Sequence, residues 1–329
     1  MDPRTAGSGE TSGVAPQVRL QPVRLESAPP IRVLVAGADG FLGSHLLPRL
    51  ESRGHIVRAT FRDANGPGRR VAPGVDWREM DLTRADQVEG LAEGCDVIVH
   101  LAGLFSRSGG QTLAQVHGTG TRHLLAEGVR AGVARFVYVS VLGARPVGGE
   151  YFSTKFDAES AVVASSLPGV VLRPSVIYGP GDQFTAAIVR LLKKLPVFPM
   201  PGGGKFRVQP LAVEDMTDAL IQCVERKDLD GRQFELAGPE RLMFREIVGF
   251  VSDALDIHRP GLHVPGRLAF LVAACARWLN LPAPFILEQL EILTTGSVLS
   301  TEDNPLLSVF YVKPLPFRHA VADYLEGTD

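Results

Sequence analysis

The stretch from Val33 to Leu46, VLVAGADGFLGSHL, decides the fold. It opens with apolar residues typical of a buried strand and closes with the apolar spacing of a helix. Between them, Gly37, Gly40 and Gly43 follow the pattern G-x-x-G-x-x-G. In such a turn the first glycine permits a sharp bend, the second lets the backbone approach a pyrophosphate held by the helix N-terminus, and the third allows close helix–strand packing. The stretch predicts a dinucleotide-binding unit, with a purely structural turn as the alternative.

Strand-like and helical segments alternate after this turn. Short apolar runs typical of buried strands occur at residues 31–36, 55–61, 96–103, 135–140 and 169–175. Helical apolar spacing occurs between them at residues 41–53 and 118–132. Buried strands separated by helices indicate a parallel sheet covered on both faces. We therefore predict an α/β fold with a doubly wound parallel sheet, a Rossmann fold, whose ligands lie beyond the carboxyl ends of the strands.

The composition of the sequence changes after residue 175. Segments rich in proline and glycine alternate with helical patterns near residues 185–194, 215–226, 244–255 and 284–293. This change predicts a smaller C-terminal lobe. The expected division is a disordered N-terminal tail (1–30), a dinucleotide-binding Rossmann domain (31–178 and 206–240) and a smaller lobe for a substrate or partner (179–205 and 241–329).

Composition excludes several functional classes. The 329 residues carry a net charge of -2, which lacks the basic surplus that binds nucleic acid. The three cysteines, Cys95, Cys223 and Cys275, are odd in number and widely spaced. This predicts buried thiols in a reducing cytoplasm, without a disulfide framework or a zinc site, and the histidines form no metal-like cluster either.

Two segments bear on targeting. Residues 1–30 lack the apolar core of a signal peptide and the periodicity of a transit peptide. The longest apolar run, at residues 268–276, is far shorter than the roughly 20 residues that a membrane-spanning helix needs. We therefore expect no transmembrane segment, and we favour a buried helix at 268–276 over membrane contact.

The end of the second strand predicts the choice of cofactor. Arg62 and Asp63 follow each other there. An arginine forms a fork on the 2′-phosphate of NADP, whereas an acidic residue accepts the 2′-hydroxyl of NAD. Because Arg62 comes first, NADP(H) is favoured. Asp63 leaves NAD(H) as the alternative. If the two residues only form an ion pair on the surface, they indicate no preference between the cofactors. Asp81 and Leu82 end the third strand, where we expect them to contact the adenine. The alternative is that Asp81 only caps the next helix.

Four motifs follow one another in the chain: the glycine turn, HLAG (100–103), YFSTK (151–155) and LRPSVIYGPGDQF (172–184). Their ordered set resembles the extended and atypical short-chain dehydrogenase/reductases, the NAD-dependent epimerase/dehydratase superfamily. With residues 195–216 and 234–247 included, the sequence is similar to the branch that contains the NADPH-binding accessory subunit of respiratory complex I and its bacterial relatives. The resemblance covers roughly residues 31–325.

The resemblance implies further cofactor-binding residues, and these also lie at the carboxyl ends of expected strands. They are Asp39, Phe41 and Leu42 near the pyrophosphate, Leu101, Ala102 and Gly103 on the adenosine side, and Pro174 and Val176 beside the nicotinamide.

Tyr151 and Lys155 are the candidate acid–base pair. Their spacing of four residues places them on one face of a helix. A tyrosine has an unperturbed pKa of about 10, so it needs a nearby cation to act near neutrality. Lys155 and an oxidised nicotinamide supply positive charge, and Lys155 would also hold the cofactor ribose. Because Y-x-x-x-K recurs by chance, two neighbours on a helix surface are the alternative.

A third group, a hydroxyl at the end of the strand before this helix, orients the substrate oxygen in related enzymes. Ser140 is the candidate, but in many relatives the catalytic serine aligns nearer Val141. Ser140 could therefore point into strand packing, because adjacent strand side chains alternate. His117 replaces an asparagine of many relatives, and as a lone histidine we expect it to be structural. On the substrate side, Asp215 is expected as a helix N-cap and Gln209 as a residue that could reach a ligand.

Two functions fit these residues. One is an NAD(P)-dependent oxidoreductase or epimerase-like enzyme that uses Tyr151 and Lys155 on a hydroxyl or carbonyl of a small molecule, with a hydrophobic substrate suggested by the apolar C-terminal part. The other, implied by the resemblance, is a non-catalytic NADPH-binding structural or assembly protein that associates with a respiratory complex. We expect a cytoplasmic location, which for the second function is peripheral to the inner membrane.

Overall fold

The structure, a computed structural model, describes residues 29–62, 72, 74–105, 110–266, 268 and 297–326. The predictions for residues 1–28, Asp63, Cys275 and the helix at 284–293, and nearly all of the apolar run at 268–276, lie outside the described residues. Within these ranges, no helix has the length and apolar character needed to cross a membrane. The same ranges contain no group of three or more side chains arranged to bind a metal ion.

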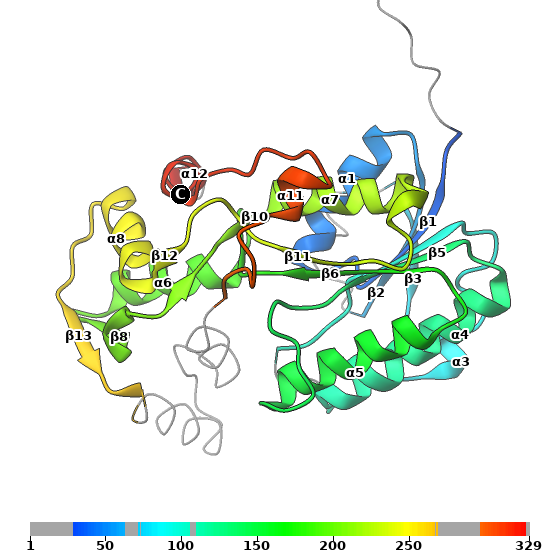
Figure 1. Ribbon diagram of the computed structural model, residues 1–329, viewed down its shortest axis with the longest axis horizontal. Helices are drawn as coiled ribbons and strands as arrows, with labels where there is room; N and C mark the ends of the chain where they lie inside the picture. Colours follow the sequence, from blue (N-terminus) through cyan, green and yellow to red (C-terminus); the bar gives the residue numbers. More distant parts are fainter. Residues whose placement is uncertain are drawn as a thin grey trace, which may run out of the picture.

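A seven-stranded sheet forms the centre of the fold, and all of its neighbouring strands are parallel (Figure 1). Across the sheet the strands are β11 (Gln233–Leu236), β6 (Gly169–Pro174), β5 (Arg135–Val139), β4 (Val97–His100), β1 (Arg32–Ala36), β2 (Ile56–Phe61) and β3 (Asp76–Glu79). The order reverses between β1 and β4, which is the point where doubly wound sheets bind ligands. The predicted fold class is confirmed.

Helices cover both faces of the sheet. They are α1 (Phe41–Ser52), α7 (Val213–Glu225) and α11 (Pro305–Ser308) on one face, and α3 (Ala85–Val88), α4 (Thr121–Ala131) and α5 (Glu150–Ala164) on the other (Figure 1). Side chains of β1 alternate between the layers: Val33 and Val35 pack with α1 and α7, whereas Leu34 and Ala36 pack with α4 and α5. Burial on both faces explains why the strands are nearly continuous apolar runs in the sequence.

A smaller lobe lies at one end of the sheet, at the left in Figure 1. Its main elements are α6 (Gln183–Lys194), β8 (Phe198–Pro201), α8 (Phe244–Ala254), β13 (Gly261–Val264) and α12 (Phe317–Glu326). They share a core of their own, in which Leu191, Phe198, Phe244, Val251 and Phe317 are buried. The helices expected near 185–194 and 244–255 correspond to α6 and α8.

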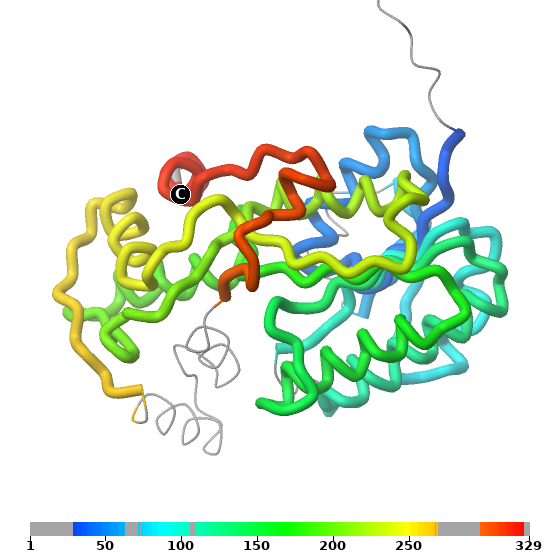
Figure 2. The backbone as a smooth tube through the Cα atoms, in the orientation of Figure 1, coloured from blue at the N-terminus to red at the C-terminus, as the bar shows by residue number. Residues whose placement is uncertain are grey.

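The C-terminal segment connects the lobe with the sheet. Leu306 and Phe310 pack into the core beside α7, and the chain then returns to the lobe as α12, a path that Figure 2 shows in orange and red. The domain division expected from the sequence stays a prediction, and this segment makes contacts on both sides of it.

The helix expected at residues 118–132 is present, and its first residues belong to a π-helical segment, η1 (Ala114–Gly120), that continues directly into α4. Two local expectations were wrong. Asp215 is not an N-cap, because α7 begins after Ala212; its carboxylate instead accepts a hydrogen bond from the N–H of Leu315 at 2.9 Å. Asp81 does not cap the next helix either, because the N-cap of α3 is Arg84.

Candidate active site

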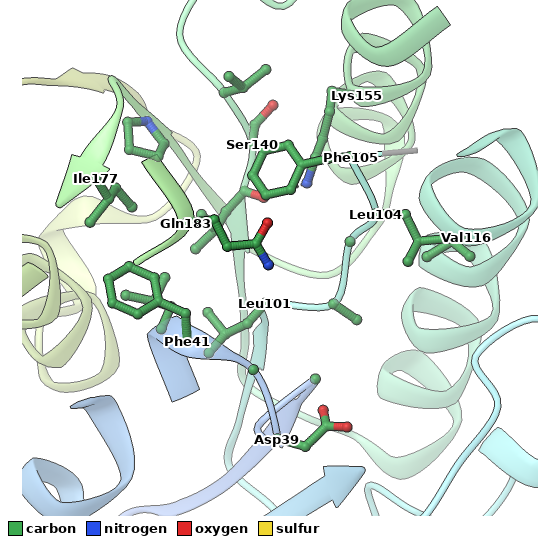
Figure 3. A pocket seen from close by; sticks show the side chains of 18 of the residues that line it. Asp39, Phe41, Leu101, Leu104, Phe105, Val116, Ser140, Lys155, Ile177 and Gln183 are labelled. Carbon is green, nitrogen blue, oxygen red and sulfur yellow. The ribbon is translucent and has the colours of Figure 1, made fainter. Parts of the chain in front are cut away.

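A cavity of about 880 Å³ opens beyond the carboxyl ends of β1, β2, β4, β5 and β6, where it meets α6 of the lobe. Among the residues that the structure describes, those that the sequence analysis proposed for cofactor binding or catalysis line it, with the exception of Gly43. Figure 3 shows Ser140, Phe105 and Lys155 on one side of the cavity and Phe41 and Ile177 on the other.

The glycine turn leaves space at the mouth of β1. Gly37 has a φ of 77°, and a Cβ atom there would lie 2.6 Å from the backbone of Ala102. A Cβ atom on Gly43 would lie 2.2 Å from the carbonyl oxygen of Ala38, so this glycine lets α1 pack against the turn. Gly40 is the N-cap residue and has no side chain to occupy the first N–H groups of α1. The helix therefore presents donors and partial positive charge to the cavity.

A polar network lies at the end of β2. The backbone N–H of Arg62 donates to Asp39 at 3.0 Å, and its guanidinium donates to Gln111 at 2.6 Å. Gln111 in turn donates to Asp81 at 2.7 Å. Burial raises the pKa of Asp81, but hydrogen bonds from Thr83 and Gln111 and the charge of Arg62 outweigh it and hold the pKa below its usual value. Arg62 therefore lines the cavity, bonded to Asp39 through its backbone and connected to Asp81 through Gln111.

Tyr151 occupies the first turn of α5 and is 5% exposed. Its ring stacks on Phe105, with 5.5 Å between the centroids, and meets the edge of His117 at 5.8 Å. Burial raises the pKa of the Tyr151 phenol above its ordinary value, because the charged phenolate is poorly solvated there. The side chain therefore carries its proton at neutral pH.

Lys155 lies one helical turn further along α5, also buried. Its ammonium donates to the carbonyl oxygen of Val139 at 3.1 Å and lies 5.1 Å from the centre of the Tyr138 ring. Burial lowers the pKa of Lys155 to about 8, and the charge of Glu159 opposes this effect. The ammonium is charged at neutral pH but close to losing its proton.

Glu159 is a site residue that the sequence analysis missed. It lies one turn beyond Lys155, is 2% exposed, and accepts a hydrogen bond from the guanidinium of Arg173 on β6 at 2.9 Å. The charge of Glu159 raises the pKa of Lys155 and so opposes the effect of burial on that ammonium. The signal in the sequence was the spacing of four residues from Lys155, which places both on one helix face.

Ser140 follows the last residue of β5 and lines the cavity. Its hydroxyl is buried and has no hydrogen-bond partner in the described part of the chain. The residue thus lines the cavity, although its hydroxyl oxygen is itself buried. Val141 also lines the cavity and packs with Leu113, Tyr151 and Phe152. An apolar side chain therefore stands next to the Ser140 hydroxyl.

His117 makes structural hydrogen bonds. Its Nε2 accepts from the N–H of Leu104 at 3.1 Å, so Nδ1 carries the proton and donates to the Thr154 hydroxyl at 2.9 Å. Burial and the charge of Lys155 lower its pKa well below the usual value, which keeps the ring neutral. His117 thus ties the loop after β4 to α5. Gln209 is structural too: it bonds Gly238 and Leu299 and does not line the cavity.

Comparison with known proteins identifies the family. Residues 33–237, more than half of the chain, match the model of the NAD dependent epimerase/dehydratase family. The chain belongs to this family. Within the match lie the glycine turn, Ser140, Tyr151 and Lys155. The predicted superfamily is therefore confirmed, and the chain belongs to a family of NAD-dependent oxidoreductases and related enzymes.

Three curated proteins illustrate the range of the family. The chain is 34% identical to a ceramide reductase of Caulobacter vibrioides over 57% of its own length, and it spans 59% of that protein. It is 25% identical to subunit 9 of the NADH dehydrogenase [ubiquinone] 1 alpha subcomplex of Arabidopsis thaliana mitochondria, over 92% of this chain and 79% of that one. It is 35% identical to a 3 beta-hydroxysteroid dehydrogenase/Delta 5-->4-isomerase of Mycobacterium tuberculosis over 46% of this chain and 48% of that one.

Solved structures share the fold. A UDP-glucose 4-epimerase of Thermus thermophilus in complex with NAD superimposes with a TM-score of 0.70 at 22% identity, covering 91% of this chain and 100% of that chain. At this identity the likeness shows only that the two chains share a fold.

Proposed function

We propose that this family member is an NAD(P)-dependent oxidoreductase that reduces a ketone on an apolar small molecule to an alcohol. One observation carries the proposal: Tyr151 and Lys155 share a cavity with Ser140, whose buried hydroxyl has no partner in the described residues. A buried hydroxyl without a partner is costly unless a ligand completes it.

The cavity residues fit a nicotinamide dinucleotide. Gly37 and Gly40 leave the N-terminus of α1 uncovered for a pyrophosphate, and Arg62 and Asp81 stand where the adenosine would lie. When bound, the nicotinamide supplies or accepts hydride. The protein's part is then to hold the substrate oxygen and to move a proton.

Tyr151 is the proton donor in this proposal. Because burial keeps the phenol protonated, the free protein has the acid form that carbonyl reduction needs. Ser140 donates a hydrogen bond to the same substrate oxygen and orients it. The ammonium of Lys155 stabilises the phenolate that forms and binds the cofactor ribose; in the structure it is bonded to Val139, so this role requires it to turn toward its neighbour on the helix.

An apolar substrate is supported by the walls around this point. Leu104, Phe105, Val141, Ile177 and Phe184 line the cavity on the substrate side. Apolar walls of this kind bind apolar surface and exclude water from the reacting group. Two of the relatives, a ceramide reductase and a hydroxysteroid dehydrogenase, are named for lipid substrates.

For the cofactor we propose a preference for NADP(H), carried by the guanidinium of Arg62. Asp39 limits that preference, because its carboxyl group lies 3.0 Å from the backbone nitrogen of the same residue. A 2′-phosphate on Arg62 would stand near this group, whereas a 2′-hydroxyl could donate to it.

A non-catalytic role in a respiratory complex is the second candidate. The observation in its favour is the extent of the likeness to the plant mitochondrial subunit, 92% of this chain. In that case Val141 beside Ser140 marks a site that retains Lys155 for ribose binding alone.

The variant Tyr151→Phe separates the two candidates. With NADPH and a panel of apolar ketones, the enzyme account predicts that wild type oxidises NADPH and that kcat falls by about 10²- to 10⁴-fold in the variant while cofactor affinity is kept. Tyr311→Phe, at a tyrosine that is 81% exposed, is the control. Equal turnover in both variants would remove Tyr151 from the mechanism, and no turnover in wild type would favour the structural role.

A further inference from the structure

We propose that the substrate carries an anionic group, a phosphate or a carboxylate, that is bound by Arg190 at the far end of an apolar wall. The proposal rests on the proposed function and adds the chemical class of the substrate.

One face of α6 forms this wall. Gln183, Phe184, Ala187 and Arg190 all line the cavity. Gln183, Ala187 and Arg190 follow one another at separations of four and three residues, which places them on one side of a helix, and Phe184 is adjacent to Gln183. The helix is fixed at its start by Asp182, which accepts hydrogen bonds from the N–H groups of Thr185 and Gly179. The position of Arg190 along the cavity is therefore set by a held helix.

Arg190 is unpaired among the residues that the structure describes. Its side chain is exposed and makes no hydrogen bond or ion pair within those ranges. The other arginine of the cavity, Arg62, is already bonded to Gln111. The carboxyl groups that line the cavity are Asp39 and Asp81 at the adenosine end and Asp182, whose oxygens serve the helix start. A guanidinium at an apolar wall without a carboxylate is suited to bind an anion from outside.

The helix also sets the length of the ligand. Seven residues separate Gln183 from Arg190, which corresponds to about 10 Å along an α-helix. Phe184 and Ala187 cover the wall between them. A ligand that reaches from the amide of Gln183 to the guanidinium thus has an apolar body of about 10 Å, the length of a medium acyl chain or a fused-ring system.

Binding of simple amphiphiles tests the inference. Decyl phosphate, decanoate and 1-decanol are titrated into NADPH-loaded protein below their micelle concentrations, with wild type, Arg190→Gln and Lys193→Gln. Lys193 is a cation of the same helix that does not line the cavity. We expect the two anions to bind wild type and Lys193→Gln at least about tenfold more tightly than decanol, and this advantage to disappear in Arg190→Gln.

Three outcomes would overturn the inference: equal affinity for anions and decanol in wild type, an advantage that survives in Arg190→Gln, or an advantage lost equally in Lys193→Gln. The relative strength of phosphate and carboxylate distinguishes a phospholipid-like head group from a free acid. Turnover of a neutral apolar ketone is measured alongside. If it is intact while the anions show no advantage, the inference fails alone; if NADPH does not bind at all, the proposed function fails.

Discussion

The ammonium of Lys155 is bonded to the carbonyl oxygen of Val139 at 3.1 Å, one residue before Ser140, whose hydroxyl has no partner within the described residues. This contact places the cation at the carboxyl end of β5, in the same cavity as Tyr151. The charge state of Lys155 then becomes a property of the site, because burial lowers its pKa to about 8 and Glu159 opposes that shift.

Glu159→Gln should move the pH dependence of the site. Lys155 is charged below about pH 8 and loses its proton in the folded protein as the pH rises through that value, so affinity for NADPH should fall there. Without the charge of Glu159, the midpoint should move to lower pH, while glutamine still offers an acceptor to Arg173. NADPH titrations between pH 6 and about 10 measure the midpoint of this pH dependence. Asp157→Asn, at an exposed position on the same helix, is the control; a common midpoint for all three proteins would refute the coupling.

Gly37→Ala should cost more than its backbone conformation alone explains. Gly37 and Gly54 have similar φ values, 77° and 81°, but a Cβ atom at Gly54 meets no atom within 4 Å. We expect Gly54→Ala to lower the free energy of unfolding by about 1 kcal/mol and Gly37→Ala by about 2 kcal/mol or more, with loss of dinucleotide binding. Denaturant unfolding and NADPH titration measure both. Equal losses of unfolding free energy in the two variants would show that the backbone readily moves to relieve the contact between the new Cβ atom and Ala102.

Arg62 and Asp39 should shift cofactor preference in opposite directions. Arg62→Gln removes the guanidinium and should weaken the binding of NADPH more than that of NADH. Asp39→Asn removes a negative charge near Arg62 and should strengthen the binding of NADPH relative to NADH. We expect each ratio to change about tenfold, which corresponds to about 1.4 kcal/mol. Direct titration of both cofactors measures the ratios. If Arg62→Gln leaves its ratio unchanged, the proposed NADP(H) preference is wrong.

Asp215→Asn should stabilise the protein at neutral pH. Burial raises the pKa of Asp215 to about 6, so its contribution to stability is full below about pH 4 and is lost as the pH rises through 6. Asparagine carries no charge and can still accept from Leu315. The variant should therefore be more stable than wild type by about 1 kcal/mol at pH 7, with the gain vanishing near pH 4. Thermal unfolding at both pH values checks the sign of the change, with Asp157→Asn, at an exposed position that is not among the charges acting on Asp215, as the control.

Local patterns in the sequence predicted most of the fold. The glycine turn and the apolar runs are short-range signals, and the Rossmann fold followed from them, whereas several of the cavity-lining positions between Asp39 and Val176 were implied by the family resemblance. Gly43 does not line the cavity, because a Cβ atom there would meet Ala38 in the packing of α1, and Gln209 does not line it either.

Long-range contacts could not be predicted in the same way. Gln111 joins Arg62 to Asp81 across three elements, and Asp215 is held by Leu315, a hundred residues away. No spacing rule connects such positions in a single sequence. Glu159 is different, since it lies four residues from the proposed residue Lys155, and a helical projection would have found it. Arg190 lies on α6, where the sequence analysis proposed no site residue.

The most direct test of the central claim is the binding and exchange of a dinucleotide. The protein is purified, any bound nucleotide is identified by mass, and its displacement by fresh NADPH and NADH is timed for wild type and Gly37→Ala. The account predicts one dinucleotide for each wild-type chain, exchange within seconds to minutes, and no binding by the variant. A wild-type protein that binds neither cofactor, or one that holds a dinucleotide without exchanging it, would contradict an oxidoreductase at this site.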